Sequence, residues 1–431
     1  MIIHKNSPIP KDVIAQQTSS ICEPSLSQYK DFIFVTGNWF AAQSEDNGTT
    51  WEYISPYSHL PKPPNGGQFD CDQTTIASIQ HHLLFWILQY DKNSAGNTNV
   101  LRLAVKNFNH NSSGSDWYWW DFSPCEVNQE WDNEWFDYNH AVVSDNYLYI
   151  GTNVFSTITN QFTRFVVLKF SLKDLANAEN TEQPEKINSQ YIQNTVSPWR
   201  ATQGAHHKMF FASHNNSNQL QLLIWDEHTN DMYEKKIAIS PWNDVGHDYS
   251  DENSLGRTWL NRCDDRVTGA WFAKGVLGFM WTANHDEHRP YPFIRVVRIK
   301  EEELDKEAPS ILDEPDIWNE DYAYAYPDAA VNQEGDVGIT LFRGGPSLPP
   351  SHCVGILDSN EPNHWLIQST VIGTHFPRGN KWGDYLACRP HPDGKSWIAT
   401  GFTLQDSDNE NTTAGREAIE PRIIHFSKST L

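Results

Sequence analysis

Ser44-Glu45-Asp46-Asn47-Gly48-Thr49-Thr50-Trp51 is the stretch that decides the fold of this chain of 431 residues. Asp46 and Asn47 can hydrogen-bond the backbone of their own turn, and Gly48 can adopt a positive φ. Thr50 and Trp51 would then begin a returning strand. The stretch therefore predicts a β-hairpin whose polar tip is locked by side chains and whose Trp51 packs into the next layer.

A hairpin pattern of strand, polar turn and second strand recurs about every sixty residues along the whole chain. In one copy, Thr74–Ile79 passes through a polar turn into Leu83–Tyr90, and in another the first strand is Gly204-Ala205. Small residues dominate these first strands, which suits a crowded innermost position. The copies begin near residues 24, 74, 140, 204, 268, 328 and 386. Seven units predict an all-β, seven-bladed β-propeller that spans 1–431 as a single domain.

The last copy shows only three strands and ends in Arg422–Phe426. A propeller avoids an exposed sheet edge by completing its last blade with another part of the chain. We therefore expect a strand from the first fifteen residues to complete this sheet and close the ring. A pair of sheets packed as a β-sandwich is the alternative architecture.

The pattern S-x-D-x-G-x-T-W at 44–51 resembles the Asp-box of sialidase-like β-propellers. The resemblance implies that this hairpin is structural and lies between the later strands of a blade. It also implies what a sialidase site needs, namely an arginine triad, a Tyr-Glu nucleophile pair and an Asp acid-base. This chain departs from that pattern, because no Arg precedes Arg102 and no early R-I-P-like motif exists. Sialic acid hydrolysis is therefore not expected.

Charge and composition restrict the partners. A formal net charge of −23 repels nucleic acid phosphates and anionic membrane surfaces, so neither is an expected partner. No stretch reaches the roughly 18 apolar residues of a membrane span. The residues Met1–Lys5 lack the apolar core of a signal peptide, which favours a cytoplasmic location. We expect a monomer or a small homo-oligomer.

The six cysteines are scattered without C-x-x-C spacing, so they predict no zinc site. Buried thiols are favoured over disulfides. His285, Asp286 and His288 are metal-ligand types, but we expect them in a solvated loop, since nothing in the sequence holds them in place. The sequence predicts no catalytic metal and no cofactor, and it leaves room for structural calcium.

Residues at the starts of innermost strands and the ends of second strands converge at one mouth of a propeller channel. These positions are rich in Asp, Tyr, His and Arg, which predicts one central pocket for a saccharide or small molecule. The catalytic candidates are Asp72, His140, Asp384 and Tyr385. The substrate-binding candidates are Tyr90, Tyr138, Arg200, His214, Arg266, Tyr326, Asp328, Arg343 and Trp382.

Each candidate has an expected role. Asp72 and Asp384 would act as acid or base, because two close carboxylates separate their pKa values. His140 or Tyr385 would carry the proton. Arginines would hold an oxyanion or leaving group; they are Arg200, Arg266 and Arg343. Two long insertions, 241–262 with Asp248, Asp251 and Arg257, and 284–289, are expected to overhang the mouth.

Three functions fit this pocket. The first is a glycan-acting enzyme, either a glycoside hydrolase or a polysaccharide lyase, that uses acid-base chemistry with arginine support. The second is a biosynthetic enzyme that cyclises or alkylates an aromatic or polyketide-terpenoid small molecule, as some propellers of this type do. The third is a lectin or scaffold. Lectin propellers repeat near-identical sites in each blade, whereas the strand starts here differ from blade to blade, which favours a single catalytic site.

Overall fold

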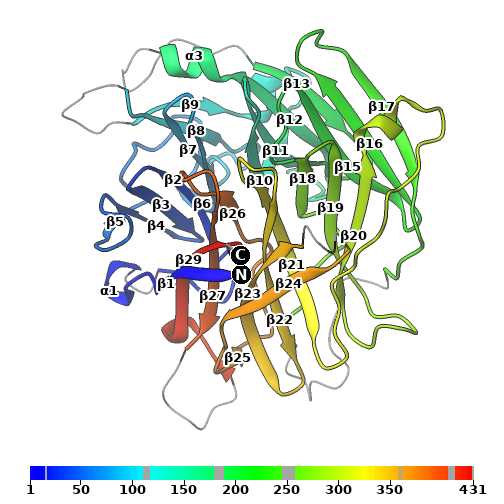
Figure 1. Cartoon of the computed structure of the whole chain (residues 1–431). Coiled ribbons are helices and arrows are strands. Elements are labelled where there is room, and N and C mark those ends of the chain that lie inside the picture. Colours follow the sequence, from blue (N-terminus) through cyan, green and yellow to red (C-terminus); the bar gives the residue numbers. More distant parts are fainter. Residues whose placement is uncertain are drawn as a thin grey trace. The chain divides into compact units, whose positions relative to one another are not determined.

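The computed structural model describes residues 1–14, 17–109, 117–178, 189–244, 258–358, 361, 363–405 and 413–429. Within these residues, strands form seven antiparallel sheets of three or four strands and one small two-stranded sheet (Figure 1). The chain is thus an all-β, seven-bladed β-propeller, as its repeated hairpins predict. Its residues group into two compact units, Ser25–Ala201 and Met1–Pro24 with Thr202–Leu431. It remains a prediction that residues 1–431 form a single domain.

The unit Ser25–Ala201 holds three four-stranded sheets, and in each the strands follow one another in sequence. The first sheet contains β2 (Ser25–Tyr29), β3 (Phe32–Gly37), β4 (Phe40–Ser44) and β5 (Glu52–Ile54). The second contains β6 (Phe69–Ser78), β7 (Leu83–Tyr90), β8 (Leu101–Asn107) and β9 (Trp117–Phe122). The third contains β10 (Glu134–Val143), β11 (Tyr147–Ser156), β12 (Phe162–Ser171) and β13 (Ser189–Asn194). Short helices α2 (Pro124–Val127) and α3 (Leu172–Asn177) flank β10 and β12.

The second unit contains the N-terminal residues and the strands of the later sheets, apart from β14, which ends the unit Ser25–Ala201. The fourth sheet has the order β14 (Arg200–Ala201), β15 (Lys208–Asn216), β16 (Gln219–Asp226) and β17 (Met232–Ala238). The fifth contains β18 (Gly269–Ala273), β19 (Val276–Ala283) and β20 (Phe293–Lys300), followed by the 3-10 helix η1 (Glu301–Asp305). The sixth contains β21 (Ala323–Val331), β22 (Val337–Gly345), β23 (Leu348–Leu357) and β24 (Trp365–Val371).

The N-terminal strand completes the last sheet, as the sequence predicts. β1 (Ile2–Pro8) pairs antiparallel with β29 (Ile419–Ser427), and the sheet has the order β1-β29-β27-β26 (Figure 1). The inner strands are β26 (Cys388–Pro390) and β27 (Trp397–Leu404). The remaining elements are α1 (Lys11–Ile14), η2 (Arg416–Ala418) and a parallel pair, β25 (Phe376–Pro377) with β28 (Thr413–Ala414).

One first strand was misplaced by the sequence pattern. Gly204-Ala205 is not a strand, and the innermost strand of that sheet is the two-residue β14. Gly204 has a φ of +80°, and Gln203 bridges to Trp271 of the next sheet. The backbone therefore turns away where the pattern predicted an extended segment.

The turn at 44–51 lies between β4 and β5 and is held by side chains as predicted. The Asp46 carboxylate accepts hydrogen bonds from Thr50 N at 2.8 Å and Thr50 Oγ1 at 2.7 Å, and these bonds lower the pKa of Asp46 to about 2. Gly48 N donates to Ser44 Oγ at 2.7 Å, and Gly48 has a φ of +73°. Trp51 is only partly buried, which corrects the expectation that it plugs into the next layer.

No helix in the described ranges is long and apolar enough to cross a membrane. The described part of the chain includes all six cysteines, and none of them forms a disulfide. Cys22, Cys263, Cys353 and Cys388 are buried, in agreement with the prediction of buried thiols.

Candidate functional site

Three innermost strands are each interrupted by a β-bulge. The register shifts between Phe69 and Gln73 in β6, between Asp137 and His140 in β10, and between Ala325 and Asp328 in β21. Bulges redirect side chains and are frequent beside active sites. Predicted site residues occupy all three bulges; they are Asp72, Tyr138 and Tyr326.

Tyr138 and Tyr326 have φ angles of +54° and +56°. A bulky residue rarely adopts a positive φ, and such strained positions gather at functional sites. Glu23, which precedes the first blade, has a φ of +47° and is 2% exposed. Glu23 and Tyr326 both belong to the second unit, where they lie near one group of charges.

Two arginines hold the carboxylate of Asp384 in this unit. Arg262 Nη2 lies 3.1 Å from Asp384 Oδ2, and Arg266 Nη2 lies 3.6 Å from the same oxygen. Arg266 Nε also pairs with Asp264 Oδ2 at 2.6 Å. We call Glu23, Arg262, Asp264, Arg266, Tyr326 and Asp384 the arginine–carboxylate cluster. The side chains of Arg262 and Asp384 remain reachable, since they are 39% and 13% exposed.

Glu23 joins the cluster through the backbone. Asp384 N donates to Glu23 Oε1 at 3.1 Å, although the two residues are 361 positions apart. Gly383 makes this approach possible, because a Cβ at that position would lie 2.8 Å from Glu23 Cγ. A second carboxylate is thereby fixed beside Asp384.

Tyr326 contributes a phenol to the cluster. Its Oη is buried and has no hydrogen-bond partner among the described residues. Burial raises the pKa of Tyr326 well above its usual value, and the nearby Cys263 and Asp384 raise it further. The phenol is therefore neutral at physiological pH, and its proton is available for donation.

Aromatic rings support the segment that carries Asp384. Trp382 is fully buried and stacks on Phe402 with ring centroids 4.4 Å apart. Its ring also packs edge-on against Phe342 and Trp259. The structure thus places Trp382, predicted to bind substrate, in the packing beneath the cluster. Tyr385, which follows Asp384, is 9% exposed.

The other predicted residues of the second unit lie in separate interactions. Asp328 is 2% exposed and pairs with Arg389 Nη1 at 3.1 Å inside the sheets. Arg343 Nη1 donates to the Tyr322 hydroxyl at 3.2 Å. The His214 ring lies 4.7 Å from the ring of Trp281.

In the unit Ser25–Ala201, the predicted residues are spread over several contacts. Asp72 accepts a hydrogen bond from Cys71 Sγ at 3.2 Å, and the His140 ring stacks on Phe165 with centroids 5.6 Å apart. The Tyr90 hydroxyl accepts a hydrogen bond from Arg102, which is itself paired with Asp121. Arg200 is a 9% exposed residue of β14.

The two insertions have different outcomes. Asp248, Asp251 and Arg257 lie outside the described residues. The segment 284–289 lies between β19 and β20 as predicted, and the Asp286 carboxylate accepts hydrogen bonds from the backbone of His288 and Arg289. The His288 side chain is 79% exposed, as expected for a solvated loop.

Sequence reasoning placed Arg266, Tyr326 and Asp384 among the site residues but missed three partners, Glu23, Arg262 and Asp264. A signal was present for each of them. Glu23 stands two residues before β2, Asp264 stands two residues before Arg266, and Arg262 ends the long insertion. All three therefore lie in segments that lead into a first strand, as the other candidates do.

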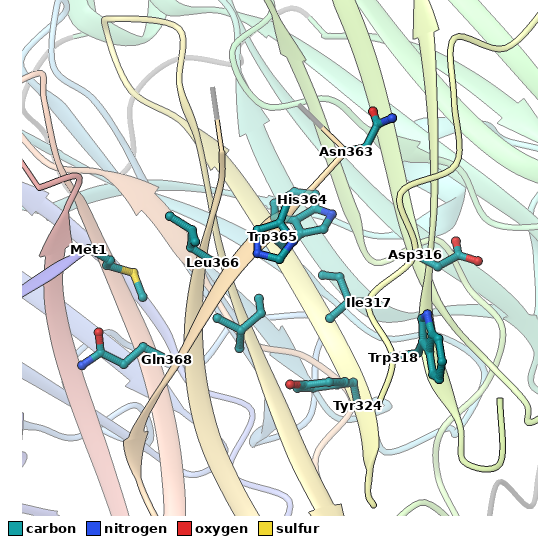
Figure 2. A pocket seen from close by; sticks show the side chains of 11 residues that line it. Met1, Asp316, Ile317, Trp318, Tyr324, Asn363, His364, Trp365, Leu366 and Gln368 are labelled. Atoms are coloured by element: carbon teal, nitrogen blue, oxygen red, sulfur yellow. The ribbon is translucent and has the colours of Figure 1, made fainter. Parts of the chain in front are cut away.

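A separate groove of about 610 Å³ is lined by Met1, 316–318, Tyr324 and 363–368. Figure 2 shows Met1 and Gln368 at one end of this groove and Asp316 and Trp318 at the other. Trp318 is 44% exposed, whereas Trp365 is buried and donates to Pro315 O at 2.9 Å. The groove contains no member of the arginine–carboxylate cluster.

No protein-family profile and no curated protein matches this sequence. Among solved structures, the chain is similar to Trypanosoma rangeli sialidase in complex with the inhibitor DANA. The identity is 10% and the TM-score 0.39, with 75% of this chain and 52% of that chain covered. This chain thus covers about half the length of that sialidase.

The chain is also similar to two further solved structures. The phage phi92 endosialidase matches with 6% identity and a TM-score of 0.43 over 99% of this chain and 69% of that chain. An α-L-arabinofuranosidase from Fusarium graminearum matches with 8% identity and a TM-score of 0.41 over 98% and 97%. The solved structures similar to this chain thus include sialidases and an arabinofuranosidase.

Proposed function

We propose that this chain is a glycan-acting enzyme and that the arginine–carboxylate cluster is its active site. The observation that carries the proposal is the Asp384 carboxylate, held by Arg262 and Arg266 near the unpartnered phenol of Tyr326. Sugar hydrolysis needs a carboxylate that faces the positive charge of an oxocarbenium-like transition state, and a proton donor for the departing oxygen. The cluster offers both.

Specific roles follow from the surroundings of each group. The Asp384 carboxylate would either stabilise the positive charge that develops at the anomeric carbon or attack that carbon. Glu23 would supply a second carboxylate. Tyr326 would donate its proton to the leaving group, since its raised pKa keeps the phenol protonated. Arg262 and Arg266 would give up hydrogen bonds to Asp384 and donate instead to hydroxyl or acidic groups of the sugar.

Hydrolysis fits these residues better than elimination. A polysaccharide lyase needs a base that removes a proton beside a uronate group, and a phenolate could serve as that base. Burial opposes the phenolate form of Tyr326, because it raises the pKa of the hydroxyl. The cluster therefore favours glycoside hydrolysis, with the sugar and linkage left to experiment.

A panel of chromogenic glycosides and polysaccharides tests the proposal. The native chain should release sugar from at least one member, and R262A should reduce that rate about a hundredfold. R378A is the matched control, because Arg378 is 64% exposed and pairs with Glu417 on the surface. Binding of a sugar without turnover would indicate a lectin. Equal rates for R262A and the native chain would place the active site elsewhere.

A further inference from the structure

Two histidines and one aspartate meet at the turn of the last sheet, among strands that include the N-terminus. His391 and Asp393 lie in the turn between β26 and β27, and His425 lies on β29. Each offers one ligand atom, and these atoms lie within 4.8 Å of one another. The Asp393 Oδ2 atom lies 3.1 Å from His391 Nδ1 and 3.8 Å from His425 Nε2.

We propose that His391, Asp393 and His425 form a binding site for a divalent transition metal such as Zn²⁺. Zinc bonds of about 2.0–2.2 Å in a tetrahedron put neighbouring ligand atoms a little over 3 Å apart. Both distances to Asp393 Oδ2 are near that value. Water would take the open position. His391 Nδ1 accepts a hydrogen bond from Asp393 N at 3.2 Å, so this ring must turn toward the metal, and the two imidazole nitrogens must move closer together.

The site is already arranged for a cation. The rings of His391 and His425 stack with centroids 4.0 Å apart, and the side chains of both residues are largely covered. Two imidazoles and one carboxylate are a ligand set that Zn²⁺ commonly takes in proteins.

Ser396 occupies the position that a metal would take. Its Oγ lies 2.6 Å from Asp393 Oδ2 and 2.7 Å from His425 Nε2, bridging two of the proposed ligands. Rotation of this one side chain frees both ligand atoms. Asp393 keeps its place meanwhile, because its Oδ1 accepts backbone hydrogen bonds from Lys395 at 2.8 Å and Ser396 at 3.0 Å.

A metal here would clamp the N-terminal strand. His4 lies on β1, and its ring centroid is 4.8 Å from that of His425. β29 carries His425 and pairs with β1, while the β26–β27 turn holds the other two ligands. The site therefore ties the turn to the strand that receives β1, and it is suited to stabilising the closure of the last sheet.

Calorimetry tests the site, by titrating the tag-free, chelator-treated chain with Zn²⁺. In a second experiment, Co²⁺ is added in place of Zn²⁺, because its visible absorption reports tetrahedral coordination. We expect one metal per chain, at least tenfold weaker binding in H391A and D393N, and equal or tighter binding in S396A. H288A is the matched control, because His288 also lies beside a carboxylate but has no second histidine ligand. D393N keeps an oxygen acceptor for the turn, so its loss of affinity would not reflect unfolding.

Hydrogen exchange tests the clamp. Bound Zn²⁺ should slow exchange of the backbone amides of β1, and this protection should disappear in H391A. Three results would overturn the proposal: no Zn²⁺ binding, unchanged affinity in both H391A and D393N, or loss of binding in H207A. His207 belongs to another group of rings, with His206 and His228. Metal bound without protection of β1 would overturn the clamp.

Discussion

The bulges within β10 and β21 are alike in backbone conformation but differ in chemistry. Each places a tyrosine at positive φ, Tyr138 in β10 and Tyr326 in β21, and regular pairing resumes at the residue two positions later. In β10 that residue is His140, whose ring stacks on Phe165. In β21 it is Asp328, which pairs with Arg389.

The difference shows how the same backbone feature can carry different surroundings, one of which we propose as the active site. The bulge fixes the direction of the tyrosine in both strands, since bulges reorient side chains without changing the rest of the sheet. Only the neighbours of Tyr326 include Asp384, Asp264 and Arg262. The chemistry therefore lies in what surrounds the second tyrosine, and the following predictions test that assignment.

The largest effect is expected for D384N. The substitution removes the carboxylate that faces Arg262 and Arg266, so turnover should fall by about 10²–10³-fold. D336N is the matched control, because Asp336 also lies between two cations, Lys274 at 3.0 Å and Lys428 at 2.8 Å. Steady-state kinetics and thermal unfolding of both variants distinguish the roles. Similar turnover in D384N and D336N would show that Asp384 is structural.

Asp328 should matter for stability. D328A removes the carboxylate that pairs with the buried Arg389, so the free energy of unfolding should fall by about 3 kcal/mol. H140A loses a ring contact and should cost about 1 kcal/mol. Denaturant unfolding measures both values. A larger loss of stability in H140A than in D328A would contradict this account, because it would make His140 the more important structural residue.

Y326F is expected to lower turnover by about a hundredfold, since it removes the proposed proton donor. Its stability should hold or rise, because the removed hydroxyl is buried and has no hydrogen bond. Y138F makes the same change at the equivalent bulge and should affect turnover at least tenfold less. Paired kinetic assays give the comparison, and equal losses in the two variants would mean that both bulges serve one site.

The smallest effect concerns Asp70 in the bulge of β6. Burial raises its pKa, and the charges of Asp91 and Asp137 raise it further. Folding therefore favours the protonated form, and this contribution to stability is lost as the pH rises through the raised pKa. D70N should raise the melting temperature at pH 7, and the gain should vanish below about pH 3.9. A gain that persists at lower pH would exclude this carboxylate as its cause.

Local patterns predicted most of the fold. Leu83–Tyr90 was predicted with the bounds that β7 has, because an apolar run between polar turns needs no distant partner. The closing strand β1 followed from the missing fourth strand of the last sheet. Gly204-Ala205 failed because a distant bridge from Gln203 to Trp271 determines that backbone.

The site was less predictable for the same reason. Strand starts indicated Arg266, Tyr326 and Asp384, and the structure brings these three together, although their catalytic roles stay predictions. Arg262 meets Asp384 across 122 positions, and Glu23 reaches it across 361. No local pattern encodes such pairs. The positive φ of Glu23 and Tyr326 is likewise visible only in the folded chain.

The most direct measurement is a crystal structure of the chain with a sugar that it releases or that inhibits it. We predict one sugar per chain, with an oxygen within hydrogen-bonding distance of Arg262 or Arg266 and the anomeric carbon beside Asp384. A sugar seated instead in the groove of Figure 2, or repeated from blade to blade, would contradict the assignment of catalysis to the arginine–carboxylate cluster.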